Sequence, residues 1–96
     1  MRLAEALRLI PEPRQQIDTF GVISLAIFGS VARDEAGPEN DVDILVEFGR
    51  PVGYFRLYEL EEFLTSLMGR PVDQFTLGTL REETHADVLR EAKRAA

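Results

Sequence analysis

The spacing of apolar residues along the chain predicts two short helices before the first strand. Apolar positions from Leu3 to Ile10 recur every three or four residues, as on one face of a helix. Pro11 and Pro13 end that helix, because proline removes a backbone donor and clashes with the preceding turn. A second helix is expected from Pro13 through Phe20, closed by Gly21.

A different pattern follows, in which apolar and β-branched residues are nearly continuous. Val22–Phe28 is expected to be a central, buried strand. Gly29-Ser30 interrupts it, and Val31–Ala36 has the residues of a short helical turn. Asp41–Phe48 begins with polar residues on alternate positions and becomes apolar on both faces, which predicts a buried strand that starts at the surface. Gly49–Gly53 is expected to be a loop.

The remaining third of the chain predicts helix, strand and helix. An apolar stripe from Tyr54 to Met68 is typical of an amphipathic helix, with Gly69 as its C-cap. Pro71–Thr76 has the pattern of a short strand. Leu80–Ala95 carries a weaker apolar stripe, from which we predict one final helix. We therefore expect residues 1–96 to form a single domain of mixed α/β class.

Composition narrows the classes of function. A formal net charge of −6 makes sequence-independent binding to nucleic acid unfavourable and suits a basic protein partner. The chain has no cysteine, so disulfides and thiolate metal sites are excluded. No apolar run approaches membrane-spanning length and the first residues do not resemble a signal peptide, so a cytoplasmic protein is expected.

The turn at Gly29-Ser30 is the first candidate for chemistry. Glycine directly after a buried strand lets the backbone turn sharply and approach a ligand closely. The helix start that follows presents unpaired N–H groups to an anion, and Ser30 adds a hydroxyl donor. A Gly-Ser turn alone is common in proteins, so this pair indicates phosphate binding only in combination with the acids that follow it.

Two acids follow at the start of the next predicted strand. Because side chains alternate along a strand, Asp41 and Asp43 point to the same side, close enough to share metal ions. Two carboxylates forced together repel each other, and a divalent cation relieves that repulsion while leaving positions for phosphate oxygens. The alternative is a solvated strand start after Pro38-Glu39-Asn40.

A third acid, Asp73, lies near the beginning of the short strand predicted at Pro71–Thr76. An adjacent strand could place this carboxylate beside Asp41 and Asp43, and three acids suggest two metal ions. We assign Asp73 the roles of metal ligand and general base, although an exposed structural aspartate is the alternative.

Gly29-Ser30 with Asp41-x-Asp43, inside IFGSVARDEAGPENDVDILVEF, resembles the minimal nucleotidyltransferase domains of the DNA polymerase beta superfamily. The similarity extends through RPVGYFRLYELEEFLTSLMGRPVDQFT to the third acid. Members of this family include MntA-like antitoxins encoded beside HEPN-domain toxins. Three positions depart from the family pattern: Asp34 stands where glycine is frequent, Asn40 where serine often precedes the first acid, and Gln74 where an apolar residue is usual.

The resemblance implies a nucleotidyltransferase fold, a small mixed β-sheet flanked by helices. It implies transfer of AMP from ATP to a tyrosine of a HEPN RNase toxin, which inactivates the toxin. Gly29 and Ser30 would bind the nucleoside triphosphate, and Asp41, Asp43 and Asp73 would bind two Mg²⁺ ions and carry catalysis. A homo- or hetero-oligomer is compatible with this assignment.

Two other functions are compatible with the same residues. The chain could be an antitoxin with a vestigial site that neutralises its toxin by binding alone. It could also be an antibiotic-type nucleotidyltransferase for small molecules, although such proteins usually carry a further domain for the acceptor. Arg33 is equally compatible with a triphosphate contact and with a solvated side chain, and His85 is expected at the surface.

Overall fold

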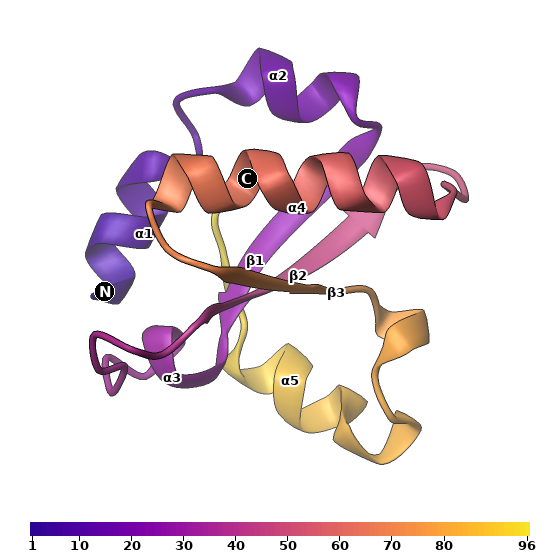
Figure 1. Ribbon diagram of the computed structural model, residues 1–96. Helices are drawn as coiled ribbons and strands as arrows, with labels where there is room; N and C mark the ends of the chain where they lie inside the picture. The colour runs from indigo at the N-terminus through magenta and orange to yellow at the C-terminus, as the bar shows by residue number, and fades with distance from the viewer.

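A computed structural model describes residues 1–96 as one four-stranded sheet with helices on both faces. The strands lie in the order β3-β2-β1-β4 and comprise β1 Val22–Phe28, β2 Val42–Phe48, β3 Val72–Phe75 and β4 Lys93–Arg94. The helices are α1 Leu3–Leu9, α2 Arg14–Thr19, α3 Gly29–Ala32, α4 Tyr54–Met68 and α5 His85–Glu91, with 3₁₀ turns η1 Leu77–Thr79 and η2 Glu82–Thr84. In Figure 1, α4 lies on one side of the sheet and α5 on the other.

The sheet is mixed, which confirms the expected fold class. β1 pairs antiparallel with β2 and with β4, whereas β2 and β3 run parallel. The parallel pair requires a crossover connection, and α4 supplies it on the face that also carries α1. This arrangement puts the beginnings of β2 and β3 at the same end of the sheet as the end of β1.

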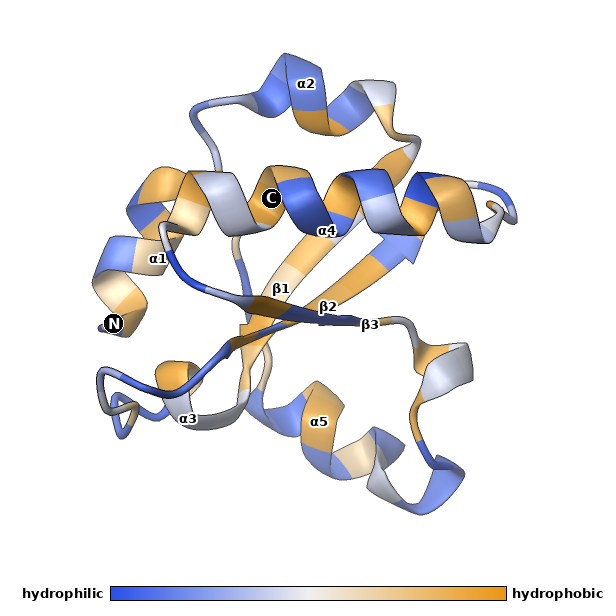
Figure 2. Ribbon diagram, viewed as in Figure 1, coloured by the Kyte–Doolittle hydropathy of each residue, from blue (hydrophilic) through white to orange (hydrophobic).

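The hydrophobic core lies between the sheet and the helices α1, α2 and α4. Alternate residues of β2, Val42, Ile44 and Val46, are almost fully buried, and Leu60 and Leu64 of α4 have no exposed surface. Figure 2 shows β1 and β2 as predominantly hydrophobic and α4 as a mixture of hydrophobic and hydrophilic positions. Because side chains alternate along a strand, the intervening residues of β2 face the opposite side of the sheet.

Most predicted element boundaries agree with the structure to within a few residues. The helix from Tyr54 to Met68 ends at Gly69, whose φ of 68° is the left-handed conformation expected of a C-cap. The short helix after β1 begins at Gly29 rather than Val31 and ends at Ala32. Asp41 precedes β2 rather than opening it.

The prediction of one helix over Leu80–Ala95 was wrong. Only His85–Glu91 is α-helical, and Lys93–Arg94 form a short strand beside β1. Beyond this strand, the Leu25 amide donates to the Ala96 carbonyl at 3.0 Å and the Ala95 amide donates to the Leu25 carbonyl at 2.8 Å. These backbone bonds to an otherwise unpaired sheet edge outweigh the weak helical pattern.

None of the helices combines the length and apolar character that crossing a membrane requires.

Candidate active site at the end of the sheet

The turn at Gly29 lies directly against Asp43, the acid on β2. Gly29 has a φ of 73° and begins α3 directly after β1. A Cβ atom at this position would overlap Oδ2 of Asp43 and lie 3.2 Å from its Cγ. Only glycine therefore satisfies both the left-handed backbone and the close approach to Asp43. The sequence prediction of a sharp turn at this glycine is confirmed.

The three predicted acids come together through the strand register. Asp43 is opposite Phe28 on β1 and opposite Asp73 on β3. Asp41 lies two residues before Asp43, and its negative charge acts on the carboxyl of Asp73. Asp41 and Asp43 are half-buried and Asp73 is exposed. The acids lie beside the Gly29-Ser30 turn, so the structure gathers every predicted site residue at one end of the sheet.

The surroundings of Asp43 and Asp73 raise the pKa of both carboxyl groups. Burial raises the pKa of Asp43 above its ordinary 3.8, and the negative charges of Asp73, Asp41 and Glu91 raise it further, against a lowering by Arg33. Partial loss of hydration raises the pKa of Asp73 as well, although its side chain is exposed, and the negative charge of Asp41 raises it further. Both carboxyl groups thus lie in a site that disfavours their charged form.

The donor set of this cluster suits a hard divalent cation. Carboxylate oxygens are the ligands that Mg²⁺ prefers, and a bound cation relieves the repulsion that adds to these pKa shifts. No group of three or more acid or imidazole side chains is arranged to hold a metal ion in the structure. The chemistry of the residues fits Mg²⁺, and binding would require the carboxylates to converge further.

A residue that the sequence did not single out, Glu91, also belongs to the site. Its Oε1 accepts a hydrogen bond from the Gly29 amide at 2.5 Å, and its Oε2 accepts one from Nη1 of Arg33 at 2.8 Å. Glu91 lies 62 residues from Gly29, at the end of α5. No local pattern indicates such a contact, because it depends on the pairing of the C-terminal strand with β1.

The other candidates in the sequence have structural partners. Arg33 is in ion pairs with Glu35 at 3.0 Å and with Glu91 at 2.8 Å. His85 is half-buried, and its Nε2 lies 3.1 Å from the Leu80 carbonyl oxygen. Arg33 therefore lies at the border of the site through Glu91, whereas His85 is held by the backbone of its own segment.

Each of the three residues that depart from the family pattern makes a side-chain hydrogen bond to the backbone. Asp34 has a φ of 56°, which glycine would adopt more easily, and its Oδ1 accepts a hydrogen bond from the Leu3 amide at 2.7 Å. Oδ1 of Asn40 accepts one from the Gly37 amide at 2.6 Å. Gln74 donates from Nε2 to the Leu57 carbonyl at 2.6 Å, while its Oε1 is buried without a partner. None removes an acid of the site.

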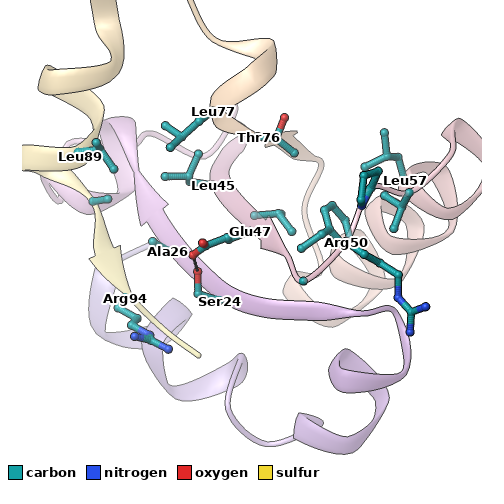
Figure 3. A pocket seen from close by; sticks show the side chains of 16 residues that line it. Ser24, Ala26, Leu45, Glu47, Arg50, Leu57, Thr76, Leu77, Leu89 and Arg94 are labelled. Atoms are coloured by element: carbon teal, nitrogen blue, oxygen red, sulfur yellow. Dashed lines mark hydrogen bonds between the residues drawn. The ribbon is translucent and has the colours of Figure 1, made fainter. Parts of the chain in front are cut away.

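The largest cavity lies farther along the same face of the sheet, with a volume of about 790 Å³. Leu45, two residues after Asp43 on β2, is on its floor, and Figure 3 shows Ser24 and Glu47 hydrogen-bonded there. None of Asp41, Asp43 and Asp73 lines this cavity, and the rings of Phe28 and Phe75, on the strands to either side of β2, lie with their centroids 5.4 Å apart. The acid cluster is therefore separate from the largest hollow of the molecule.

Comparison with known proteins assigns the family. The sequence profile described as nucleotidyltransferase domain matches residues 8–95. The chain belongs to the nucleotidyltransferase domain family. This nucleotidyltransferase is 40% identical over 74 residues to protein adenylyltransferase MntA of Thermococcus cleftensis, covering 77% of this chain and 75% of that protein. Among the first curated relatives, the chain spans 64% to 75% of their length.

Solved structures agree with the assignment. A protein provisionally described as a minimal nucleotidyltransferase superposes with a TM-score of 0.81 at 34% identity, covering 97% of this nucleotidyltransferase and 95% of that chain. A chain from the complex of the tri-AMPylated HEPN toxin of Shewanella oneidensis with MNT antitoxin gives a TM-score of 0.67 at 17% identity, covering 98% and 71%. The second likeness is one of fold alone. The family resemblance stated from the sequence is confirmed.

Proposed function

We propose that this nucleotidyltransferase transfers AMP from ATP to a tyrosine of a cognate HEPN RNase toxin and acts as its antitoxin. The observation that carries the proposal is the register of Asp43 with Asp73 on neighbouring parallel strands, beside the Gly29-Ser30 turn. The MntA relative is named a protein adenylyltransferase, and the same fold occurs in a complex with an AMPylated HEPN toxin. These similarities support ATP as the nucleotide and a HEPN toxin as the acceptor protein.

Each residue has a proposed role. Gly29 brings the backbone close to the phosphates, and Ser30 donates from its amide and hydroxyl. Asp41, Asp43 and Asp73 would hold two Mg²⁺ ions, which would neutralise the charge of the triphosphate and of the leaving pyrophosphate. Asp73 also accepts the proton of the acceptor hydroxyl, a role for which its exposure and raised pKa are suitable.

The proposed reaction is a single displacement at the α-phosphorus. The acceptor oxygen forms a bond to that phosphorus, and the bond from it to the bridging oxygen of the β-phosphate breaks. Pyrophosphate leaves with that electron pair, and the acceptor proton passes to Oδ of Asp73. The net charge of −6 favours an acceptor protein with a basic contact surface over a nucleic acid.

Mass spectrometry of the partner tests the proposal. The protein is incubated with Mg²⁺, ATP and a HEPN protein that co-purifies with it, and the partner's mass and modified residue are determined. We expect addition of AMP to a tyrosine by wild type and none by the Asp41→Asn, Asp43→Asn double variant. A stable complex with an unmodified partner would instead favour neutralisation by binding alone.

A further inference from the structure

Glu91 holds the short helix α3 from both of its ends. Its Oε1 accepts from the amide of Gly29, the first residue of α3, and its Oε2 accepts from Arg33, the residue that caps α3. The Glu91 side chain keeps only 30% of its surface exposed. One carboxylate from the far end of the chain therefore fixes both sides of the turn that follows β1.

The sheet itself places Glu91 at this position. Ala26 pairs with Arg94 and Ile27 with Lys93 in the antiparallel register of β1 and β4. Continuing that register by two residues brings Glu91 opposite Gly29. Figure 1 shows α5 beside α3, where the chain enters the edge of the sheet. The contact is thus a consequence of strand pairing rather than of a loosely attached helix.

The contact leaves the donors of Ser30 free. A hydrogen bond from a backbone amide to a carboxylate is among the stronger ones in proteins and fixes the orientation of that peptide group. Gly29 has a φ of 73°, a conformation from which an unrestrained glycine can readily depart. The next peptide carries the Ser30 amide, and the Ser30 hydroxyl donates no hydrogen bond within the chain.

We propose that Glu91 is a positioning residue for nucleotide binding: through Gly29 and Arg33 it holds the turn that presents the amide and hydroxyl of Ser30 to the triphosphate. Glu91 itself contacts neither ATP nor Mg²⁺ in this scheme. The inference rests on the proposed function, since it takes Ser30 as a phosphate ligand. In this scheme Arg33 supports the turn and does not bind the triphosphate.

The opposite role would be competition, in which the Glu91 carboxylate occupies a phosphate position and must leave before ATP binds. The two roles predict opposite changes in affinity when the carboxylate is removed. The two hydrogen bonds of Glu91, to the Gly29 amide and to Arg33, favour positioning, because displacement of the side chain would break both of them.

The test is calorimetric titration of the protein with ATP in Mg²⁺, together with the thermal midpoint of each variant. Glu91→Ala removes both acceptors, whereas Glu91→Gln keeps the shape and one acceptor for the Gly29 amide. Glu83→Gln is the matched control, because Glu83 lies in the exposed turn before α5 and makes no hydrogen bond or ion pair.

We expect Glu91→Ala to weaken ATP binding about tenfold, Glu91→Gln about threefold, and Glu83→Gln not at all, the scale being that of a charge-assisted hydrogen bond. Partial rescue by glutamine at an unchanged thermal midpoint separates positioning from a general loss of structure. Wild-type affinity or tighter binding in both Glu91 variants overturns the inference alone. Absence of ATP binding by the wild-type protein overturns the proposed function as well.

Discussion

Asp43 on β2 and Asp73 on β3 are direct partners in the only parallel pair of the sheet. Neighbouring carboxylates at such positions repel each other, and the pKa of each is raised, chiefly because each has lost part of its hydration. A cluster of this kind lowers the stability of the folded protein while no cation or nucleotide is bound. A role in binding a cation and a nucleotide explains why the protein keeps it.

Asp43→Asn should stabilise the metal-free protein while abolishing transfer. The substitution removes one charge from a half-buried acidic cluster, and we expect a gain of roughly 0.5 kcal/mol in unfolding free energy, the scale of a partly screened charge contact. Denaturant unfolding in chelator measures it. Added Mg²⁺ should raise the stability of wild type and have less effect on the variant. Equal stabilisation of both by Mg²⁺ would contradict the assignment of Asp43 as a ligand.

The stability difference between Asp43→Asn and wild type should depend on pH. A carboxyl whose pKa is higher in the folded than in the unfolded chain binds its proton more tightly when folded. Its contribution to stability is therefore present below the ordinary value of 3.8 and is lost as pH rises through the raised folded pKa. The advantage of the variant should be small at acidic pH and grow toward neutrality in chelator. An advantage that shrinks with rising pH would contradict the raised pKa.

Gly29→Ala should be more destabilising than Gly69→Ala, although the two glycines have similar φ values of 73° and 68°. Alanine in the left-handed region costs about 1 to 2 kcal/mol at either position. At Gly69 nothing lies within 4 Å of the added Cβ, whereas at Gly29 it would overlap Asp43. Chemical denaturation of the two variants isolates the cost of that contact. Equal losses would show that the turn relaxes away from Asp43.

Ser30→Ala should weaken ATP binding without unfolding the chain. The Ser30 hydroxyl donates no hydrogen bond within the protein, so its removal leaves no unsatisfied partner in the fold. Loss of one phosphate donor should reduce affinity about tenfold, and calorimetric titration with ATP and Mg²⁺ measures this change. Unchanged affinity would mean that backbone amides alone bind the phosphate.

Much of the site could be predicted from the sequence because its signals are local. Gly29-Ser30 after a continuous apolar strand, and the alternation of Asp41 with Asp43, each follow from a few neighbouring residues. Glu91 could not be found in this way. Its contact with Gly29 requires the register of β4 on β1, and the two residues of β4 were predicted as helix. Short edge strands carry too few side chains to have a distinctive pattern.

The most direct test of the central claim is the initial rate of label transfer from ATP labelled at the α-phosphate to the HEPN partner, measured for wild type, Asp43→Asn, Asp73→Asn and Glu47→Gln. Glu47 lies farther along β2 and hydrogen-bonds Ser24, so its variant removes an acid from the same strand outside the cluster. We expect Mg²⁺-dependent labelling by wild type and Glu47→Gln, and losses of at least a hundredfold in both aspartate variants. Labelling that persists in the aspartate variants, or its absence from wild type with an intact complex, would contradict the account.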